Sequence, residues 1–380
     1  MKILVACDSF KGCMSSREVC ENIKRGILRA NQEHEVYTFP VADGGEGTSD
    51  VFCDLLDGQR MDVQSVDAYG KKIQTHYCMS KDHSLAIMDV ASCIGLNMTS
   101  REKRNPMVAS SRGVGLLMKD AIAKGCTKLI IGLGGSATND GGIGILSEFG
   151  VRFYDSKREL LNPNVYSLNK IAFVDKRNAN IPKNVEIIVA CDVKNHLLGR
   201  QGATYVFGKQ KGIYVNQMEE IDRAMTHYRN KLLQTFHVDI DTFEGSGAAG
   251  GIGSVLLGIF HAQMKSGIEL VLEYSDLKNH LQNADLMITG EGQTDAQTLY
   301  GKLPMGISHL AKEYEIPCIC LSGALGVGYE DLYNEGMIGI FSSADRAMTF
   351  QTALQTGNVK IEALAFNLTK FMDGIRGIKK

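Results

Sequence analysis

Short apolar runs alternate with helical patterns at the start of the chain. Residues 2–7 (KILVAC) and 35–41 (EVYTFPV) are apolar and have the length of buried strands. Between them, apolar residues recur every four positions over 19–27, and Ser15 with Glu18 forms a capping box that marks the start of a helix. The chain therefore begins with a strand–helix–strand unit.

The pattern changes after residue 60. Over 73–79, apolar and polar residues alternate behind a turn at 69–71, which predicts a half-exposed antiparallel strand and so a second sheet. Strand–helix alternation then resumes. The elements expected in this middle part are a helix over 111–124, a strand over 128–133, a helix that opens after Asp140, a strand over 186–191 and a helix over 217–236.

The last third of the chain returns to parallel-sheet patterning, with apolar runs at 285–290, 317–322 and 338–342. Two N-terminal strands are too few for a stable parallel sheet, so these runs are expected to complete it. We predict an α/β protein of two domains with the active site in the cleft between them. A Rossmann-like parallel-sheet domain comprises residues 1–60 plus 256–380, and a second α/β domain of mixed sheet, 61–255, is inserted into it.

Composition narrows the class of protein. A formal net charge of -2 over 380 residues gives no signal for nucleic acid. No apolar run of about 18 residues occurs, and residues 1–7 are too short for a signal peptide, so neither membrane insertion nor export is expected and the predicted location is cytoplasmic. The ten cysteines form no CxxC pair, which favours reduced core thiols over a disulfide or zinc framework.

Polar segments follow six of the predicted strands. Ligands of open α/β sheets bind beyond the carboxyl ends of the strands, so these segments are expected to converge on one cleft. Any one of them alone would serve equally well as a turn or a helix cap. The six are DSFKG (8–12), ADGGEGT (42–48), GGSATNDGG (134–142), CDV (191–193), TGEGQTD (289–295) and SGALG (322–326).

Glycines, lysines and carboxylates in these segments point to anion chemistry. Glycine lets backbone N–H groups approach a ligand closely, and lysines beside glycine add a cation near phosphate or carboxylate oxygens. Several carboxylates near phosphates typically provide a general base and ligands for a divalent cation. The lysines are Lys11, Lys209, Lys211 and Lys302, and the acids are Asp8, Asp43, Asp192, Glu291 and Asp295.

Other chemistries have weaker sequence support. GxGxx(G/A) matches at 132–137 and 245–250 lack a ribose-binding acid at the right distance, and no P-loop, GxSxG or HExxH motif occurs. Two alternatives stay open: an NAD-dependent oxidoreductase of a small hydroxy acid, built on 132–137, and a non-catalytic protein that senses such an acid.

Seven segments, in the same order along nearly the whole chain, resemble the motifs of the bacterial type I glycerate kinases, which are glycerate 2-kinase like. The resemblance implies a two-domain α/β enzyme that uses ATP and a divalent cation, expected to be Mg²⁺, to phosphorylate D-glycerate. It favours 2-phosphoglycerate over 3-phosphoglycerate as the product. The segments are DSFKG, VADGGEGT, GGSATNDGG, CDVKN (191–195), VFGKQKG (206–212), GAAGGIG (247–253) and ITGEGQTDAQTLYGKLP (288–304).

Two positions depart from the family pattern. Cys7 stands where proline is common, and Val114 stands where threonine is frequent. The second change removes a hydroxyl and leaves Ser110 and Ser111 as candidates for contact with the substrate.

The resemblance suggests roles for individual residues. The catalytic candidates are Asp192, Asp43 and Lys11, and either Asp192 or Asp43 is expected to accept the proton of the glycerate hydroxyl. Lys11 and Lys211 are expected to hold carboxylate or phosphate oxygens. Asp8 and Ser9 join the substrate site, and Glu291 and Asp295 hold the cation. The nucleotide-binding candidates are Gly134, Gly135, Ser136, Thr138, Asn139, Asp140, Gly141, Gly290 and Gly292. The expected partners are glycerate and ATP, and the apolar helices at 217–236 and 361–372 allow a homo-oligomer.

Overall fold

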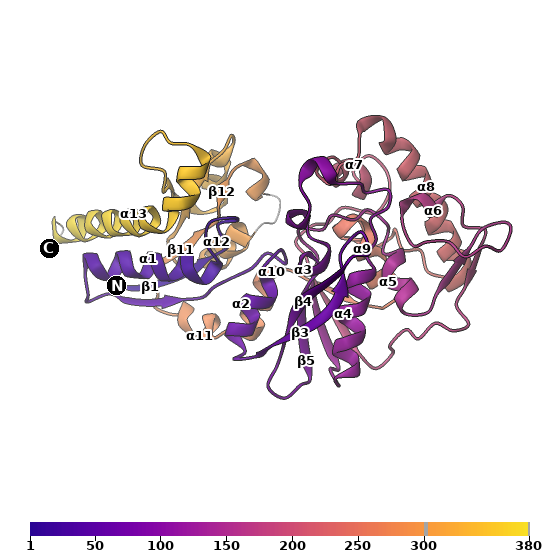
Figure 1. The fold of residues 1–380 in the computed structure, drawn as a ribbon. Coiled ribbons are helices and arrows are strands. Elements are labelled where there is room, and N and C mark those ends of the chain that lie inside the picture. The colour runs from indigo at the N-terminus through magenta and orange to yellow at the C-terminus, as the bar shows by residue number, and fades with distance from the viewer. Residues whose placement is uncertain (300–302, 379–380) are drawn as a thin grey trace. The chain divides into compact units, whose positions relative to one another are not determined.

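The computed structural model describes residues 1–299 and 303–378 and divides into two compact units. Unit 1 comprises Met1–Asp43 and Gly267–Lys380, and unit 2 comprises Gly44–Ser266. Unit 2 is therefore an insertion in the sequence of unit 1, whose two segments are the indigo start and the orange-to-yellow end of the chain in Figure 1. Each unit has a sheet of its own.

Unit 1 is an α/β unit built on a five-stranded parallel sheet, and helices connect and flank its strands. Its main strands are β1 (Lys2–Cys7), β2 (Glu35–Thr38), β11 (Leu286–Gly290), β13 (Cys318–Ser322) and β15 (Met337–Ser342). Its helices are α1 (Ser16–Ala30), α10 (Gly267–Tyr274), α11 (Leu277–Leu281), α12 (Leu303–Glu313) and α13 (Phe350–Ile378), with 3-10 turns η3 (Ala296–Leu299) and η4 (Tyr329–Glu335). A second, two-stranded sheet pairs β12 (Gln293–Thr294) with β14 (Ala324–Leu325).

The strand order of unit 1 predicts a crevice at the carboxyl ends of two neighbouring strands. The order is β15-β13-β11-β1-β2, and every pair is parallel. This is the flavodoxin-like order, in which the winding direction reverses between the first and third strands, here β1 and β11. Connections that leave these two strands run to opposite faces of the sheet, so a ligand crevice is expected beyond Cys7 and Gly290.

Both faces of the unit 1 sheet are covered by helices. Ile3 and Val5 belong to a core shared with residues of α1 and α13, two helices that lie side by side in Figure 1. Cys320 and Ile340 pack on the opposite face with Met305 of α12. Because alternate strand residues point to opposite faces, a continuous apolar strand can serve both layers.

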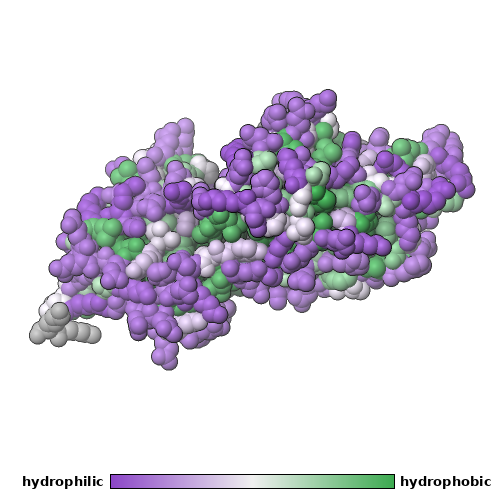
Figure 2. Space-filling model, turned by 90° about the horizontal axis from the view of Figure 1, so that it is seen from below, coloured by the Kyte–Doolittle hydropathy of each residue, from purple (hydrophilic) through white to green (hydrophobic). Residues whose placement is uncertain are grey.

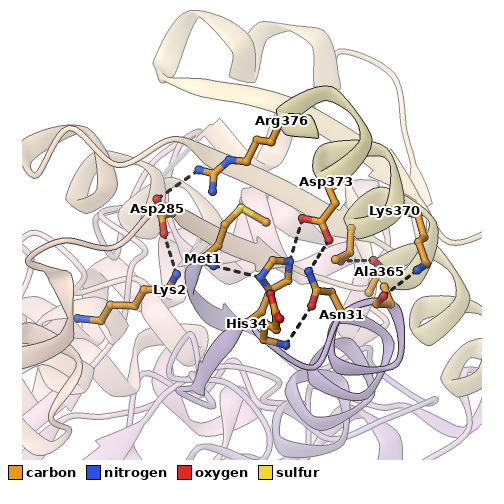
Figure 3. A network of polar contacts seen from close by, with 12 residues as sticks. Met1, Lys2, Asn31, His34, Asp285, Ala365, Lys370, Asp373 and Arg376 are labelled. Atoms are coloured by element: carbon orange, nitrogen blue, oxygen red, sulfur yellow. Dashed lines mark hydrogen bonds and ion pairs between the residues drawn. The ribbon is translucent and has the colours of Figure 1, made fainter. Parts of the chain in front are cut away.

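Polar contacts hold the end of α13 against the N-terminal part of unit 1 (Figure 3). Asp373 accepts a hydrogen bond from Asn31 Nδ2 at 2.9 Å and lies 3.1 Å from His34 Nε2. Arg376 donates to Asp285 at 3.2 Å. The contacts of Asp373 join two segments that unit 2 separates in the chain, whereas Arg376 and Asp285 both lie in the second segment of unit 1.

Unit 2 contains a mixed sheet in the order β10-β9-β6-β5-β4-β3. Its strands are β3 (Gln59–Val66), β4 (Lys72–Met79), β5 (Leu85–Asp89), β6 (Lys128–Gly132), β9 (Glu186–Ala190) and β10 (Gln263–Lys265). A separate two-stranded antiparallel sheet pairs β7 (Arg152–Tyr154) with β8 (Phe173–Asp175). The expected antiparallel strand is β4, which pairs antiparallel with β3 and β5. The mixed α/β architecture predicted from the sequence is thus confirmed.

The helices of unit 2 cover this sheet and carry its loops. They are α2 (Thr48–Leu55), α3 (Ala91–Ile94), α4 (Arg112–Ala123), α5 (Ile143–Glu148), α6 (Val165–Leu168), α7 (Ala203–Lys211), α8 (Val215–Phe236) and α9 (Ala248–Gly258), with 3-10 turns η1 (Leu96–Met98) and η2 (Arg101–Lys103). The long amphipathic pattern at 217–236 forms α8, whose buried residues include Met225, Tyr228 and Leu232.

The borders of the compact units differ from the domain borders predicted at 60 and 255. Residues 44–60 and 256–266 belong to unit 2. Helix α2 packs on β4 and β5, and β10 pairs with β9, so both segments contribute to the unit 2 core and sheet. Their apolar content alone does not reveal which of two sheets they join.

Polar residues cover most of the face shown in Figure 2, with smaller apolar groups among them. Within the described residues, no helix combines the length and apolar character needed to cross a bilayer. The ten cysteines are thiols, and eight of them are buried, as the scattered apolar positions of these residues predicted.

Candidate active site

A cavity of about 360 Å³ lies at the switch point of unit 1. Its polar wall comes from the loops that follow β1 and β11 and from the end of the first chain segment. These are the positions at which the flavodoxin-like order predicts a crevice. The polar wall contains Asp8, Ser9, Lys11, Asp43, Glu291 and Gln293, together with the backbone of Gly292.

Asp8 is a buried carboxyl group with an unusual titration. It is only 8% exposed, and its Oδ1 accepts a hydrogen bond from the Ser9 amide at 2.6 Å. Burial and, after it, the nearby charge of Asp43 raise the pKa of Asp8 to about 8, against the opposing effect of Lys11. The site therefore places a carboxyl group that changes its charge near neutral pH beside other charged groups.

Lys11 and Asp43 form an ion pair within the same cavity. The distance from Lys11 Nζ to Asp43 Oδ2 is 3.7 Å, and the lysine side chain remains 65% exposed. The charge of Asp43 is the main reason that the pKa of Lys11 is raised. Lys11 is thus a permanent cation at neutral pH, and it is accessible to an anionic ligand.

Glu291 occupies the opposite side of the switch point, after β11. It is 7% exposed, and its Oε1 accepts hydrogen bonds from Thr298 at 2.6 Å and from Thr294 at 3.3 Å. These two hydroxyls fix the carboxylate in one orientation. Glu291 also contributes to the raised pKa of Asp8, which indicates that the two acids are electrostatically close.

Asp295, predicted to share the cation with Glu291, has a different environment. Its Oδ2 accepts a bond from Gln293 Nε2 at 3.0 Å, and its Oδ1 accepts one from the Gln297 amide at 2.9 Å. It does not belong to the cavity wall. The carboxylates that share the cavity with Glu291 are those of Asp8 and Asp43.

Gly290 and Gly292 have distinct structural roles. A Cβ at Gly290 would lie 2.0 Å from the Leu321 carbonyl, so the close packing of β11 on β13 requires glycine. The Gly290 carbonyl also accepts a hydrogen bond from the Asp8 amide at 2.9 Å. Gly292 lines the cavity and packs against the backbone of Phe10 and Lys11, where a Cβ would be in ordinary contact.

A second polar cluster lies in unit 2 around the loop GGSATNDGG. Lys211, at the end of α7, is 2% exposed, and its Nζ donates to Ser136 Oγ at 3.1 Å and to the Thr138 carbonyl at 2.7 Å. Burial lowers the pKa of Lys211 to about 7, although the charge of Asp140 partly opposes the shift. The buried ammonium thus ties α7 to the glycine-rich loop.

The glycines of the segment GAAGGIG complete this cluster. Ala249, Gly250 and Gly251 are all left-handed, with φ values of 53°, 67° and 92°. A Cβ at Gly250 would lie 2.1 Å from the Thr138 carbonyl and 2.8 Å from Lys211 Nζ. The Gly250 carbonyl accepts the amide of Gly141 at 3.0 Å, so the two glycine-rich segments pack directly on each other.

Asp140 and Ser111 bond to each other in the interior of unit 2. Asp140 Oδ2 accepts the Ser111 amide at 2.7 Å and the Ser111 hydroxyl at 2.9 Å, while Oδ1 accepts the Gly142 amide at 3.1 Å. Burial raises the pKa of Asp140. This arrangement joins the start of α4 to the start of α5 and positions the end of the loop.

Two neighbouring loop residues keep unused hydrogen-bonding capacity. Asn139 Nδ2 donates to Thr204 at 3.0 Å, but in the described part of the chain neither Asn139 Oδ1 nor Thr138 Oγ1 has a hydrogen-bond partner. Both side chains are fully buried. Buried polar atoms without partners are rare, and one explanation is a missing ligand or water.

The other predicted residues of unit 2 have the following places. The Gly134 amide donates to the Gly44 carbonyl at 2.8 Å, and the Gly135 carbonyl accepts the Leu96 amide at 2.8 Å. Ser110 Oγ would lie 2.6 Å from a Cβ at Gly144, so it packs against α5. Asp192 follows β9 and is half-buried. Lys209 is exposed on α7, and Lys302 lies outside the described residues.

Asp89 is a buried acid that the sequence interpretation missed. It ends β5 and accepts hydrogen bonds from the Ser49 amide at 3.1 Å, the Ser49 hydroxyl at 2.9 Å and the Gly47 amide at 3.1 Å. Burial raises the pKa of Asp89 to about 7. It therefore anchors the segment GGEGTS, which begins α2. The signal available in the sequence was an acid at the end of an apolar run, LAIMD.

Comparison with known proteins identifies the family. The model of the glycerate kinase family matches residues 3–373. The chain is 38% identical to glycerate kinase of Bacillus cereus over 97% of both chains, and 36% identical to glycerate 2-kinase of Escherichia coli over 90% of both. The crystal structure of putative glycerate kinase 2 from Salmonella typhimurium is 34% identical, with a TM-score of 0.84 over 99% of both chains. The chain belongs to the glycerate kinase family and is a phosphotransferase.

Proposed function

We propose that this protein transfers the γ-phosphoryl group of ATP to a hydroxyl of D-glycerate, and that the 2-hydroxyl is preferred over the 3-hydroxyl. The observation that carries this proposal is the Lys11–Asp43 pair in a cavity that also contains Asp8 and Glu291. A lysine can hold the carboxylate of a small acid, and an adjacent carboxylate can accept a hydroxyl proton.

Asp43 is the better of the two general-base candidates. In phosphoryl transfer, the protein aligns the hydroxyl with the γ-phosphoryl group, neutralises phosphate charge and provides a proton acceptor, and it forms no covalent bond itself. Asp43 shares a cavity with a lysine that remains accessible, so it lies where an anionic substrate would be held. Asp192 stays the alternative, because it follows β9 among the polar residues of unit 2.

For the unit 2 cluster we propose a role in holding the nucleotide phosphates. Its support is the glycine-rich backbone, whose N–H groups suit an anion, and the unused capacity of Thr138 and Asn139. Lys211 is buried and donates hydrogen bonds to the loop at 134–142, so we propose that it positions this loop rather than holding substrate oxygens directly. The hydrogen bonds between Asp140 and Ser111 attach the same loop to the start of α4.

Magnesium is the cation that we propose to accompany ATP. Within residues 1–299 and 303–378, no three His, Cys, Asp or Glu side chains form a complete protein cage for a metal. Magnesium needs only one or two carboxylates in addition to phosphate oxygens, and the acids of the cavity, Asp8, Asp43 and Glu291, supply oxygen ligands of this type. When bound, the ion neutralises charge on the phosphate oxygens.

A steady-state assay separates the proposed kinase from its alternatives. Purified protein is mixed with ATP, MgCl₂ and D-glycerate, and ADP is followed with a coupled enzyme. Release of ADP that requires D-glycerate supports the kinase. A nicotinamide absorbance change would support the oxidoreductase, and binding of glycerate without turnover would support the sensor. We propose the cytoplasm as the place of action, because ATP is supplied there.

A further inference from the structure

The wall of the unit 1 cavity that faces the polar residues is apolar and built mainly by the start of α13. We call it the apolar wall, and it consists of Phe10, Cys13, Met348, Phe350, Ala353 and Leu354. Phe350 is 78% exposed at the edge of this cavity. An exposed aromatic residue at the edge of a cavity is typical of a ligand contact.

Specific contacts hold the apolar wall in place. Cys13 Sγ donates to the Leu354 carbonyl at 3.0 Å, and a Cβ at Gly357 would lie 2.5 Å from the same sulfur. The loop that precedes α13 is fixed by an ion pair between Asp345 and Lys360. Lys360 lines the cavity, but its charge is engaged by Asp345. These contacts hold Cys13 and Leu354 of the apolar wall in place, while Phe350 is exposed at its edge.

Glycerate does not account for this surface. It is a three-carbon acid that carries two hydroxyls and a carboxylate, so Lys11 and the carboxylates can satisfy it without apolar contact. The cavity of about 360 Å³ lies within the range of sites that enclose much larger ligands. Among the reactants of the proposed reaction, only the nucleotide has a large planar apolar group.

The polar wall suits the sugar that would accompany such a group. Ribose hydroxyls donate hydrogen bonds to amide oxygens, and the side chain of Gln293 supplies one in the polar wall of this cavity. The cavity also lies at the switch point of a parallel sheet, the position where α/β proteins bind nucleotides.

We propose that the apolar wall binds the purine ring of ATP and ADP, with Phe350 packed on the ring and Leu354 and Met348 beneath it. This inference rests on the proposed kinase function. It assigns the nucleoside subsite to unit 1 and does not depend on which residues hold the phosphates.

Fluorescence tests the subsite without turnover, because the chain contains no tryptophan. Ala353→Trp places the only tryptophan in the apolar wall. The control Phe371→Trp places it on the same helix at a residue that is 65% exposed and outside the cavity wall. Each variant is titrated with ADP, with D-glycerate and with inorganic phosphate, and far-UV circular dichroism confirms its fold.

The proposal expects ADP to shift and quench the emission of Ala353→Trp in a saturable way while Phe371→Trp stays unchanged. If the introduced ring fills the subsite, Phe350→Trp provides the same readout from the exposed edge. The absence of an ADP response in both cavity variants would overturn the proposal. A response to D-glycerate but not to ADP would overturn it as well, because the apolar wall would then be part of the glycerate site.

Kinetics give an independent readout. Phe350→Ala is expected to raise KM for ATP about tenfold, the loss that one aromatic contact of about 1.4 kcal/mol implies, with KM for glycerate unchanged. The matched control Phe371→Ala leaves both constants unchanged. An increase in KM for glycerate alone would contradict the assignment. Failure of the proposed function would appear separately, as wild-type protein that binds ADP but does not phosphorylate glycerate.

Discussion

Asp8 illustrates how burial and charge set the behaviour of a single residue. Its carboxyl group has an ordinary pKa of 3.8 and a folded pKa of about 8. Between these values the folded protein keeps a proton that the unfolded chain releases, so the free energy of unfolding falls as pH rises toward 8 and then levels off. At neutral pH, Asp8 is therefore a cost to stability, as is common for residues placed for function.

Replacing Asp8 with asparagine tests this sign. Asp8→Asn removes the titration, so its melting temperature relative to wild type is expected to increase from pH 5 to pH 8. Between the two pKa values the gain is on the order of 1.4 kcal/mol for each pH unit, and it levels off near pH 8. Thermal melts in EDTA measure it. A difference between variant and wild type that is constant over this pH range would contradict the buried environment of Asp8.

Asp43 and Asp192 differ in what surrounds them, and their variants decide between them. Asp43→Asn is expected to lower kcat by about 10² to 10⁴, the usual contribution of a general base, with a melting temperature close to that of wild type. Asp192→Asn is expected to lower kcat less. If Asp192→Asn shows the larger loss, the base assignment moves to unit 2.

The positions of some site residues could be predicted from the sequence and those of others could not. Asp8, Lys11, Asp43 and Glu291 directly follow or flank apolar runs, and the structure places them in one cavity. The burial of Lys211 depends on partners more than 70 residues away, Ser136 and Thr138, which no local pattern reveals. Likewise, the sequence LAIMD shows an acid at the end of a strand, but it does not show that Asp89 is buried and bonded to Gly47 and Ser49.

At the scale of elements, the glycine-rich segments act through their backbone. Most of the strands and the longer helices follow from apolar periodicity, as β4 and α8 show. The left-handed run at Ala249, Gly250 and Gly251 is different, because the composition GAAGG allows it but only packing against the loop at 134–142 requires it.

Gly250→Ala tests that packing. The new methyl group would meet the Thr138 carbonyl at 2.1 Å, so the loop must move, and we expect a large fall in melting temperature and loss of activity. Gly70→Ala is the matched control: its φ is +81° and no atom lies within 4 Å of the added Cβ, so it carries only a backbone cost of about 1 kcal/mol. Equal losses in both variants would show that the left-handed backbone, and not packing, determines the outcome.

The end of α13 contributes to stability through Asp373. Asp373→Ala removes the contacts to Asn31 and His34, and we expect a loss of about 1.5 to 3 kcal/mol, the range for hydrogen bonds to a charged group. Chemical denaturation of the variant measures it. Asn367→Ala, at an exposed position of the same helix, is expected to match wild type. Wild-type stability in Asp373→Ala would mean that the contacts of Asp373 drawn in Figure 3 add nothing to stability.

At the scale of the whole molecule, the chain returns to its first sheet after a long insertion. The sequence indicates this return, because the strands before residue 43 cannot form a sheet alone. It does not locate the borders, since α2 and β10 have patterns that suit either sheet, and only their pairing with unit 2 decides. The order β15-β13-β11-β1-β2 is also a property of tertiary pairing, and it determines where the crevice of unit 1 opens.

The most direct test of the central claim is to identify the product by ³¹P NMR after incubation of the protein with ATP, MgCl₂ and D-glycerate. The account predicts that ADP accumulates together with a phosphate ester whose phosphorus signal is a doublet, because the carbon of the 2-hydroxyl bears one proton. A triplet would show transfer to the 3-hydroxyl and contradict the preference. Inorganic phosphate in place of any ester, or no consumption of ATP, would contradict the kinase itself.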